Sequence, residues 1–415
     1  MNKNIAAAII ALALTACSAG AGNAPGIAES AAETSAVTQA QISTDTAPYT
    51  QVSGDEELAR SLYSTGNTER IQKAMVKAQN GEKCTLAYIG GSITEGVGAA
   101  KDTCYAYLSY KRFADRYGTG DNVEYVNAGM SGTPSNLGML RAQRDILDKQ
   151  PDVVFVEFAV NDSTDTMAQN CYESLLRTLL NGESAPAVIL VINRTDNGYN
   201  AGEHMKKLGE YYSLPVVSVT DAITPLIDEG KMSWSDYSND GAHPNINGHE
   251  RIAEMIDNYY AAAEKTPSEG YTVPAEALIG APYENARLIT PVYGQEGCAE
   301  TEDTGSFVPS SKGCSGFPES WDWDGGDKPL KAHGKFTALF VIYKRNKTDN
   351  MGAFEVYLNG ERAGKFKTKQ ADGWGEAYSE QVIKFHEPHD MDIEIRPSAD
   401  SEGKSIDILG IAIVE

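Results

Sequence analysis

Between residues 86 and 260, short and almost continuously apolar segments alternate with segments of helical period. The apolar segments have the length of strands and lie at residues 86–90, 123–127, 152–158, 187–193 and 215–220. The helical patterns lie at residues 104–118, 134–150, 168–182, 201–213 and 243–260, the last with Asn247 and Glu250 as a capping box. Strands without a polar face are typical of sheets covered by helices on both sides. The pattern therefore predicts a three-layer α/β domain with a mostly parallel sheet, over residues 54–265.

The pattern changes after residue 265. Residues 266–280 combine Pro, Ser, Glu and Gly without a helical or strand period, which is typical of a linker. Beyond them come strand-like segments with no helical pattern between them, and Asn359-Gly360 is a strong hairpin-turn signal. These segments lie at residues 335–345, 352–368, 379–388, 391–397 and 406–415. We therefore expect a second domain, an antiparallel β-sandwich, over residues 281–415.

The amino-terminal segment resembles an export signal. Lys3 precedes twelve apolar or small residues, which are too few to span a bilayer as a permanent helix. This run ends in Leu-Thr-Ala-Cys at Cys17, which resembles a bacterial lipobox and predicts a lipoprotein signal peptide over residues 1–17. An ordinary signal peptide cleaved near Ala16 is the alternative. Residues 18–53 are rich in Ala, Ser, Thr, Gly and Gln, with Tyr49 as the only aromatic residue, and predict a disordered tether. We therefore expect an extracytoplasmic protein that is lipid-anchored to the cell membrane.

The net charge argues against one class of binding partner, and the cysteine content raises the question of a disulfide bond. The 415 residues carry 35 basic and 58 acidic side chains, a formal net charge of -23, and no cluster of Lys or Arg. This balance argues against a nucleic-acid partner, because phosphate binding needs clustered positive charge. Five cysteines follow Cys17, and Cys298 and Cys314 are close enough in sequence to pair, although spacing alone does not decide it.

Chemistry-bearing residues follow three of the predicted strands. Ser92 comes after Gly90-Gly91 at the end of the first strand, Gly132 follows the second, and Asn161 follows the third. Asp240 and His243 share a loop before the last helix. Ligands of parallel sheets bind at the carboxyl ends of the strands, where these residues would meet. A nucleophile, a base, a carboxylate to orient the base and oxyanion donors are the groups that acyl transfer needs.

These four segments resemble, in order, the blocks of the SGNH (GDSL-like) hydrolase superfamily. The resemblance implies a flavodoxin-like three-layer domain in which Ser92 is the nucleophile, His243 the general base and Asp240 the residue that orients it. It also implies an oxyanion hole formed by the backbone N–H groups of Ser92 and Gly132 and the side-chain amide of Asn161. Gly129 remains an alternative to Gly132. Two positions depart from the usual pattern, since Gly91 replaces an Asp before the nucleophile and Ala159 replaces a Gly.

Other polar and aromatic residues have two readings each. Trp234 and Tyr237 precede the Asp–His loop and either stack on a sugar ring or pack the loop. His249 is expected to stabilise the start of the last helix, and with His243 and Asp240 it matches no recognised metal-ligand motif, so we expect neither a metal nor a cofactor. Trp321 and Trp323 could form a carbohydrate platform or be packed inside the second domain.

The expected function is hydrolysis of small acyl esters, most simply acetyl esters, on carbohydrate. The chemistry follows from the residues above, whereas the acetylated carbohydrate substrate rests on the resemblance to bacterial carbohydrate esterases that pair such a domain with a β-sandwich. The alternatives are a lipid or thioester hydrolase of the same superfamily, and a non-catalytic surface protein that binds carbohydrate. The expected partners are the acylated carbohydrate and, through the lipid, the membrane.

Overall fold

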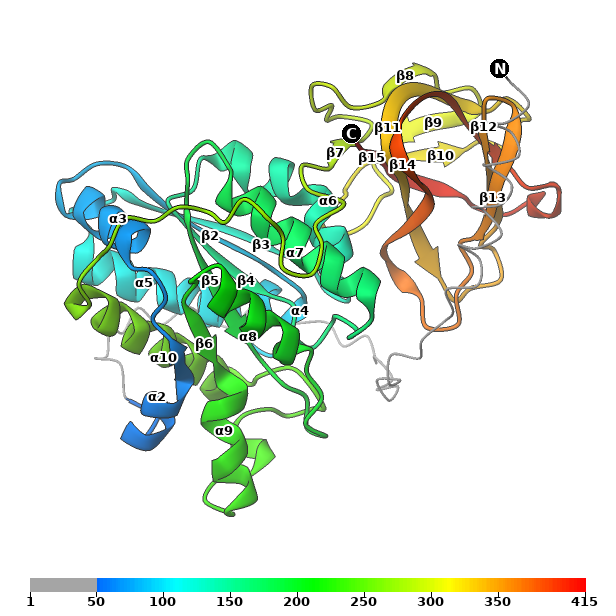
Figure 1. The fold of residues 1–415 in the computed structure, drawn as a ribbon. Helices are drawn as coiled ribbons and strands as arrows, with labels where there is room; N and C mark the ends of the chain where they lie inside the picture. Colours follow the sequence, from blue (N-terminus) through cyan, green and yellow to red (C-terminus); the bar gives the residue numbers. More distant parts are fainter. Residues whose placement is uncertain (1–50) are drawn as a thin grey trace.

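A computed structural model describes residues 51–415. The predicted signal peptide, the lipidation site Cys17 and residues 18–50 of the predicted tether lie outside the described residues. Figure 1 shows an α/β domain and a β-rich domain that packs against one end of it. Ser53, which the sequence assigned to the tether, is buried at 4 % exposure, and the Glu254 carboxylate accepts hydrogen bonds from its N–H (2.7 Å) and from that of Val52 (2.9 Å). The folded domain therefore begins at or before Val52.

A six-stranded sheet of order β1-β6-β5-β4-β2-β3 forms the centre of the α/β domain. Its strands are β1 (Leu62–Ser64), β2 (Cys84–Gly90), β3 (Val123–Gly129), β4 (Val153–Glu157), β5 (Ala187–Ile192) and β6 (Val216–Ser218). β2 to β6 are parallel, and only the short edge strand β1 is antiparallel. The helices are α2 (Asp55–Ser61), α3 (Glu69–Gln79), α4 (Ser92–Glu95), α5 (Tyr105–Tyr117), α6 (Ser135–Asp145), α7 (Thr166–Leu180), α8 (Gly202–Tyr211), α9 (Val219–Asp228) and α10 (Ile246–Lys265). The predicted fold class is confirmed.

Helices cover both faces of this sheet, which explains why its strands are apolar throughout. Residues of α3, α5 and α10 form one buried cluster with the side chains of one face, and residues of α6, α7 and α8 form a second cluster with the other face. Strands β2, β4, β5 and β6 are buried at every position. Because both faces of these strands are buried, polar and apolar residues do not alternate along them.

Several boundaries differ from the sequence prediction. The predicted capping box at Asn247 and Glu250 is wrong, because α10 begins two residues earlier: the side chain of Asn245 accepts from the N–H of Gly248 (3.0 Å), and Glu250 pairs with Arg112. The apolar segment 215–220 is a strand only to Ser218, whose hydroxyl accepts from Asp221 N (3.2 Å) and caps α9. Helices α2, α3 and α9 and strand β1 were not predicted from the sequence.

The second domain is one nine-stranded antiparallel sheet that curves around its own core (Figure 1). Its strands are β7 (Arg287–Ile289), β8 (Glu300–Asp303), β9 (Phe307–Ser310), β10 (Ser320–Trp323), β11 (Leu330–Asn346), β12 (Ala353–Leu358), β13 (Glu361–Lys367), β14 (Trp374–Pro397) and β15 (Asp407–Val414). The predicted segments 379–388 and 391–397 are parts of the single strand β14. Asn359 and Gly360 have φ of 49° and 81°, as a tight hairpin turn requires.

Three sequence alternatives in this domain are decided. Cys298 and Cys314 are both free, so the two do not pair. Trp321 is 3 % exposed and belongs to the core of the second domain. The indole N–H of Trp323 donates to the carbonyl of Gly326 (2.7 Å). Packing thus accounts for Trp321, and the pair does not form an exposed carbohydrate platform.

The linker is tied to the α/β domain along its length. The buried carboxylate of Glu173 accepts from the N–H groups of Leu278 (2.5 Å), Ile279 (2.7 Å) and Gly280 (2.7 Å). Arg177 donates to the carbonyls of Pro274, Ala275 and Glu276 and pairs with Glu284 (2.7 Å). These contacts fix the path of the chain between the domains.

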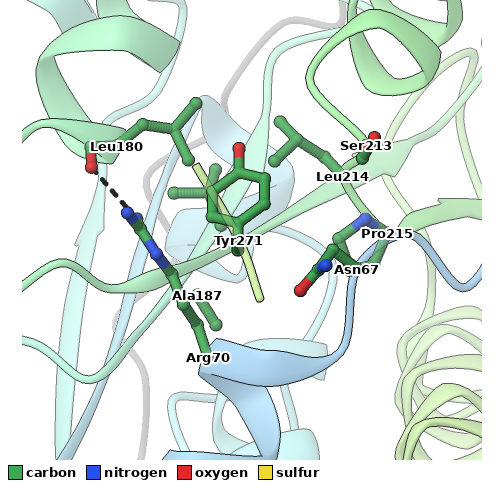
Figure 2. Close-up of a pocket in the computed structure, with 9 residues that line it drawn as sticks. Asn67, Arg70, Leu180, Ala187, Ser213, Leu214, Pro215 and Tyr271 are labelled. Atoms are coloured by element: carbon green, nitrogen blue, oxygen red, sulfur yellow. Dashed lines mark hydrogen bonds between the residues drawn. The ribbon is translucent and has the colours of Figure 1, made fainter. Parts of the chain in front are cut away.

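The beginning of the linker is held in the same way, at a point where it crosses the α/β domain. Figure 2 shows Tyr271 beside Arg70, whose guanidinium lies 4.8 Å from the ring centroid and donates to the carbonyl of Leu180 (3.0 Å). The cavity between these residues has a volume of only about 10 Å³, which is room for one water molecule. The contact between Tyr271 and Arg70 therefore holds the linker in place.

The two domains share a continuous apolar core. Side chains of β11 and β15, among them Phe340 and Leu409, belong to the same buried cluster as Met139 of α6 and Phe158 after β4. Arg144 of α6 reinforces the contact, since its guanidinium lies 4.3 Å from the ring centroid of Phe317. The second domain therefore has a fixed position beside the carboxyl ends of β2 and β3. Within residues 51–415, no helix is both long and apolar enough to cross a bilayer.

Candidate active site

Ser92 lies in a tight turn at the carboxyl end of strand β2, between β4 and β3 in the sheet. It is the first residue of the one-turn helix α4 and is 7 % exposed. The two glycines before it are required by space and not by a left-handed backbone: Gly91 has φ of -88°, but a Cβ there would lie 2.2 Å from Asn161 Oδ1. A Cβ on Gly90 would lie 2.1 Å from Thr94 Oγ1. The absence of both side chains allows Asn161 and the α4 turn to approach β2.

Ser92, His243 and Asp240 form a continuous hydrogen-bonded chain. The His243 Nε2 atom lies 2.9 Å from Ser92 Oγ, and His243 Nδ1 lies 2.8 Å from Asp240 Oδ2. Asp240 Oδ1 also accepts from the backbone N–H groups of Ala242 and His243, both at 2.7 Å. Residues far apart in sequence thus meet in the geometry by which a serine hydroxyl passes its proton to an imidazole held by a carboxylate.

Asp240 is held in its ionised form by its hydrogen bonds. Partial burial raises the pKa of this carboxyl, but the backbone N–H groups of Ala242 and His243 and the His243 ring outweigh that effect, so its pKa lies below the usual value. The loop around it is also fixed, since the carbonyl of Asp240 accepts from Trp234 Nε1 (2.5 Å) and from Ser238 Oγ (2.9 Å). An ionised Asp240 favours the tautomer with the proton on His243 Nδ1, leaving Nε2 free to accept.

Three potential oxyanion donors remain unpaired beside Ser92. The N–H of Ser92 begins a helix, and neither it, the N–H of Gly132 nor the amide nitrogen of Asn161 has a hydrogen-bond partner within residues 51–415. By contrast, the N–H of Gly129 donates to Asn127 Oδ1 (2.8 Å), and a Cβ on Gly129 would lie 2.1 Å from Glu95 N. Gly129 thus allows close packing, and Gly132, at φ of 70°, has the free N–H.

The aromatic residues before the Asp–His loop support that loop. Tyr237 is fully buried and its hydroxyl donates to Asn193 Oδ1 (2.9 Å), so of the two alternatives that the sequence left open, packing of the loop is the one that fits Tyr237. Trp234 is half-buried, and its indole N–H donates to the backbone carbonyl of Asp240. His249 is buried, accepts at Nδ1 from the N–H of Tyr105 (3.1 Å) and lies with Nε2 3.1 Å from the carbonyl of Val97. No cluster of His, Cys, Asp or Glu among the described residues could hold a metal ion.

The second domain adds an aromatic residue that the sequence analysis missed. Trp374, the first residue of β14, is 55 % exposed, and its ring lies so close to Gly132 that a Cβ there would be 3.2 Å from Trp374 Cζ2. The signal in the sequence is an aromatic residue between two glycines, Gly373 and Gly375. That signal says nothing about proximity to Gly132, because the contact depends on how the two domains dock.

A buried carboxyl group, that of Glu157, contacts the turn that carries Ser92. Glu157, at the end of β4, is fully buried, and its Oε2 accepts from Thr94 Oγ1 (3.4 Å), which in turn lies 2.8 Å from Tyr105 Oη. Burial raises the pKa of Glu157 to about 7, against the opposing effect of the hydrogen bond from Thr94. Burial likewise raises the pKa of Asp162 to about 7. Both groups bind a proton more tightly in the folded than in the unfolded chain.

This pKa difference predicts a pH-dependent stability. Between about pH 4.5 and 7 the folded protein retains the Glu157 proton that the unfolded chain releases, so the free energy of unfolding falls as the pH rises through this window. Urea unfolding at about pH 5 and pH 8 should show that Glu157→Gln removes about 2 kcal/mol of this loss. Glu82→Gln, at an exposed position, should leave the difference unchanged, and an equal loss in wild type and Glu157→Gln would contradict the assignment.

Fold and site together define the class of the protein. A parallel sheet covered on both faces, with Ser92, Asn161 and the Asp240–His243 pair at its carboxyl edge, is the arrangement of SGNH hydrolases. The comparison with known families agrees. Residues 88–251, within the α/β domain, match the model of the GDSL-like Lipase/Acylhydrolase family. The protein is a carboxylic ester hydrolase.

Individual relatives share one or both domains. The chain is 25 % identical over 176 residues to "Esterase TesA" of Pseudomonas aeruginosa, an alignment that covers 41 % of this chain and 85 % of that protein. Its fold is similar to crystal structures of a two-domain esterase (CEX) active on acetylated mannans. With the mannopentaose co-crystal the TM-score is 0.74 at 24 % identity, covering 86 % of this chain and 98 % of the other. A second crystal structure of that esterase gives 0.74 at 23 %, covering 86 % and 99 %. These likenesses show that both domains occur together in one known fold.

Proposed function

We propose that this protein is a serine esterase that removes acetyl groups from carbohydrate, with Ser92 as nucleophile, His243 as general base and Asp240 as the residue that orients the base. The observation that carries the proposal is the unbroken chain from Ser92 Oγ to His243 Nε2 (2.9 Å) and from His243 Nδ1 to Asp240 Oδ2 (2.8 Å). A serine alcohol is a weak nucleophile until a neighbouring base takes its proton, and these distances allow that transfer.

The reaction proceeds in two halves. Ser92 Oγ adds to the ester carbonyl carbon while its proton passes to His243 Nε2, and the N–H groups of Ser92 and Gly132 and the amide of Asn161 stabilise the oxyanion. The bond to the sugar oxygen then breaks as His243 returns the proton to that oxygen, leaving an acetyl ester on Ser92. Water attacks this ester, again with His243 as base, and acetic acid leaves as the Ser92 hydroxyl re-forms.

The carbohydrate substrate is supported by two structural observations and by the net charge. One is the position of Trp374, whose exposed ring lies against Gly132 and so beside the proposed oxyanion site. An exposed aromatic face at this position can stack on the apolar face of a sugar ring. The other is the two-domain fold shared with an esterase active on acetylated mannans. An acidic protein with formal charge -23 is also better suited to a neutral acetylated glycan than to a polyanion.

Acetate release from acetylated polysaccharides tests the proposal. Purified wild-type protein and Ser92→Ala are incubated in parallel with acetylated mannan, acetylated xylan and O-acetylated peptidoglycan, and free acetate is measured. We expect wild type to release acetate from at least one of these glycans and Ser92→Ala to release none above the rate without enzyme. Absence of release by wild type from every glycan, with activity on simple esters intact, would overturn the carbohydrate assignment.

The acyl-chain preference separates this function from its main alternative, a lipid or thioester hydrolase. The p-nitrophenyl esters of acetate, butyrate and octanoate, together with acetyl- and octanoyl-thioesters, provide the comparison. We expect kcat/KM to be highest for acetate. A higher kcat/KM for octanoate, or for the thioesters, would favour the alternative.

Trp374 provides a more specific expectation. Removing its ring should raise KM for an acetylated oligosaccharide by about tenfold through lost apolar contact, with kcat nearly unchanged. Trp374→Ala should leave the hydrolysis of p-nitrophenyl acetate within about twofold, since that substrate has no sugar, and Trp374→Phe should be intermediate. Tyr63→Ala removes a comparably exposed ring on the distant edge strand β1 and serves as control. Equal losses on both substrates would contradict a stacking role.

The cellular location is proposed on the amino-terminal sequence. The Leu-Thr-Ala-Cys segment ending at Cys17 supports diacylation of that cysteine and attachment outside the cytoplasm. Metabolic labelling with a clickable fatty acid should mark the wild-type protein and not Cys17→Ala. Labelling of both would show that Cys17 is not the lipid attachment point.

A further inference from the structure

Glu95 connects three segments that meet beside the proposed nucleophile. It is the last residue of α4, three positions after Ser92, and its own N–H donates to the carbonyl of Gly91 (3.0 Å). Its backbone is thus part of the turn that holds Ser92. A displacement of the Glu95 side chain acts on the same short helix that presents the Ser92 hydroxyl.

One oxygen of the Glu95 carboxylate holds the neighbouring loop. Glu95 Oε2 accepts both the backbone N–H of Ser131 (2.8 Å) and the Ser131 hydroxyl. The carbonyl carbon of Ser131 is bonded to the nitrogen of Gly132, so anchoring the backbone N–H and the side chain of Ser131 restricts the position of the next peptide group, which carries the Gly132 N–H. Gly132 has φ of 70°, a conformation that glycine adopts readily. The carboxylate therefore sets the direction of one proposed oxyanion donor.

The other oxygen faces the second domain. Ser315, in the connection between β9 and β10, donates through its hydroxyl to Glu95 Oε1 (3.4 Å). The next residue, Gly316, packs so closely on the same loop that a Cβ there would lie 2.6 Å from Met130 Sδ. The second domain thus packs on the segment 130–132 through Gly316, and it donates a hydrogen bond to Glu95 through Ser315.

We propose that Glu95 is a positioning residue that orients the Gly132 N–H toward the oxyanion, and that the second domain takes part in this through Ser315. The inference rests on the proposed serine-esterase function. A carboxylate is suited to this task because one oxygen can accept two hydrogen bonds while the other remains available to a third donor. The β-rich domain then contributes to turnover itself, in addition to any contact with the glycan.

Because the oxyanion forms only in the transition state, the effect should appear in kcat and not in KM. Removing an oxyanion donor costs about 10²- to 10³-fold in kcat, so misdirecting one in Glu95→Ala should cost roughly 10- to 100-fold. Glu95→Gln retains an acceptor for Ser131 and should recover most of this loss. Ser315→Ala removes one long hydrogen bond and should lower kcat about two- to fivefold.

The experiment measures kcat and KM for p-nitrophenyl acetate, the unfolding midpoint, and the rate of inactivation by a p-nitrophenyl phosphonate, whose P–O group occupies the oxyanion position. Glu95→Ala should slow inactivation in proportion to kcat, with KM within about twofold. Ser310→Ala is the matched control, since its hydroxyl donates to Asp322 (2.7 Å) in the second domain and not to Glu95.

The outcomes are distinguishable. A fully folded Glu95→Ala with wild-type kcat and inactivation rate would overturn this inference while leaving the esterase function intact, provided that Ser92→Ala is inactive. A rise in KM at unchanged kcat would also overturn it, because that result indicates ground-state substrate binding. If Glu95→Ala fails to fold, Ser315→Ala decides: wild-type kcat and inactivation rate in this variant would contradict the proposal. An active Ser92→Ala would instead refute the proposed function on which the inference rests.

Discussion

Ser92→Ala is expected to lower kcat roughly 10⁶-fold while leaving KM within a few-fold. The nucleophile and its base act as a unit, so removing the hydroxyl eliminates the acyl-enzyme route, and only the contribution of the oxyanion donors and of substrate binding remains. The fold should tolerate the change, because Ser92 Oγ has His243 Nε2 as its hydrogen-bond partner among the described residues and the side chain is small.

Initial rates with p-nitrophenyl acetate and with an acetylated oligosaccharide, together with the unfolding midpoint, provide the measurement. Ser163→Ala is a matched control: it lies two residues after Asn161, and its hydroxyl donates to Asp165 Oδ2 (2.6 Å) without reaching Ser92. It should retain activity within about twofold. Retention of more than about 1 % of kcat by Ser92→Ala, with contaminating wild type excluded, would mean that another residue is the nucleophile.

Asp240→Asn is expected to lower kcat by roughly 10³- to 10⁴-fold. The amide oxygen of Asn can still accept from the N–H groups of Ala242 and His243, so the loop keeps its shape. The amide nitrogen, however, replaces Oδ2 opposite His243 Nδ1 and can only donate. The imidazole must then carry its proton on Nε2, facing Ser92 Oγ, where it cannot accept a proton.

The test compares kcat for Asp240→Asn and Asp240→Ala, with the unfolding midpoint of each. Asp240→Ala removes the acceptor for two backbone N–H groups and should therefore lower the unfolding midpoint. Asp240→Asn keeps this acceptor and should have the unfolding midpoint of wild type. A folded Asp240→Asn with kcat within about tenfold of wild type would show that Asp240 does not fix the His243 tautomer.

The candidate site residues that the structure brings together are those whose place along the chain local chemistry determines. Strand ends with Ser92, Gly132 and Asn161, and a loop with Asp240 and His243, are visible because polar groups interrupt buried apolar runs. Parallel topology then brings such ends to one edge of the sheet. Their spatial meeting did not need knowledge of the second domain.

The parts that were missed depend on packing between distant segments. Trp374 lies beside Gly132 only because the second domain docks on α6, and Glu95 bonds to Ser315 for the same reason. The sequence left the role of Tyr237 open because an aromatic residue near a loop has the same appearance in sequence whether it faces solvent or the core.

The apolar core that crosses the domain boundary limits how the two domains can be separated or exchanged by protein engineering. Phe340 and Leu409 complete a hydrophobic cluster begun by Met139 and Phe158, so the α/β half produced alone would present that surface to water and tend to aggregate. Grafting a different β-rich half onto it would equally require a matched apolar face. New substrate specificities in this architecture are therefore more accessible through surface loops than through recombination of whole domains.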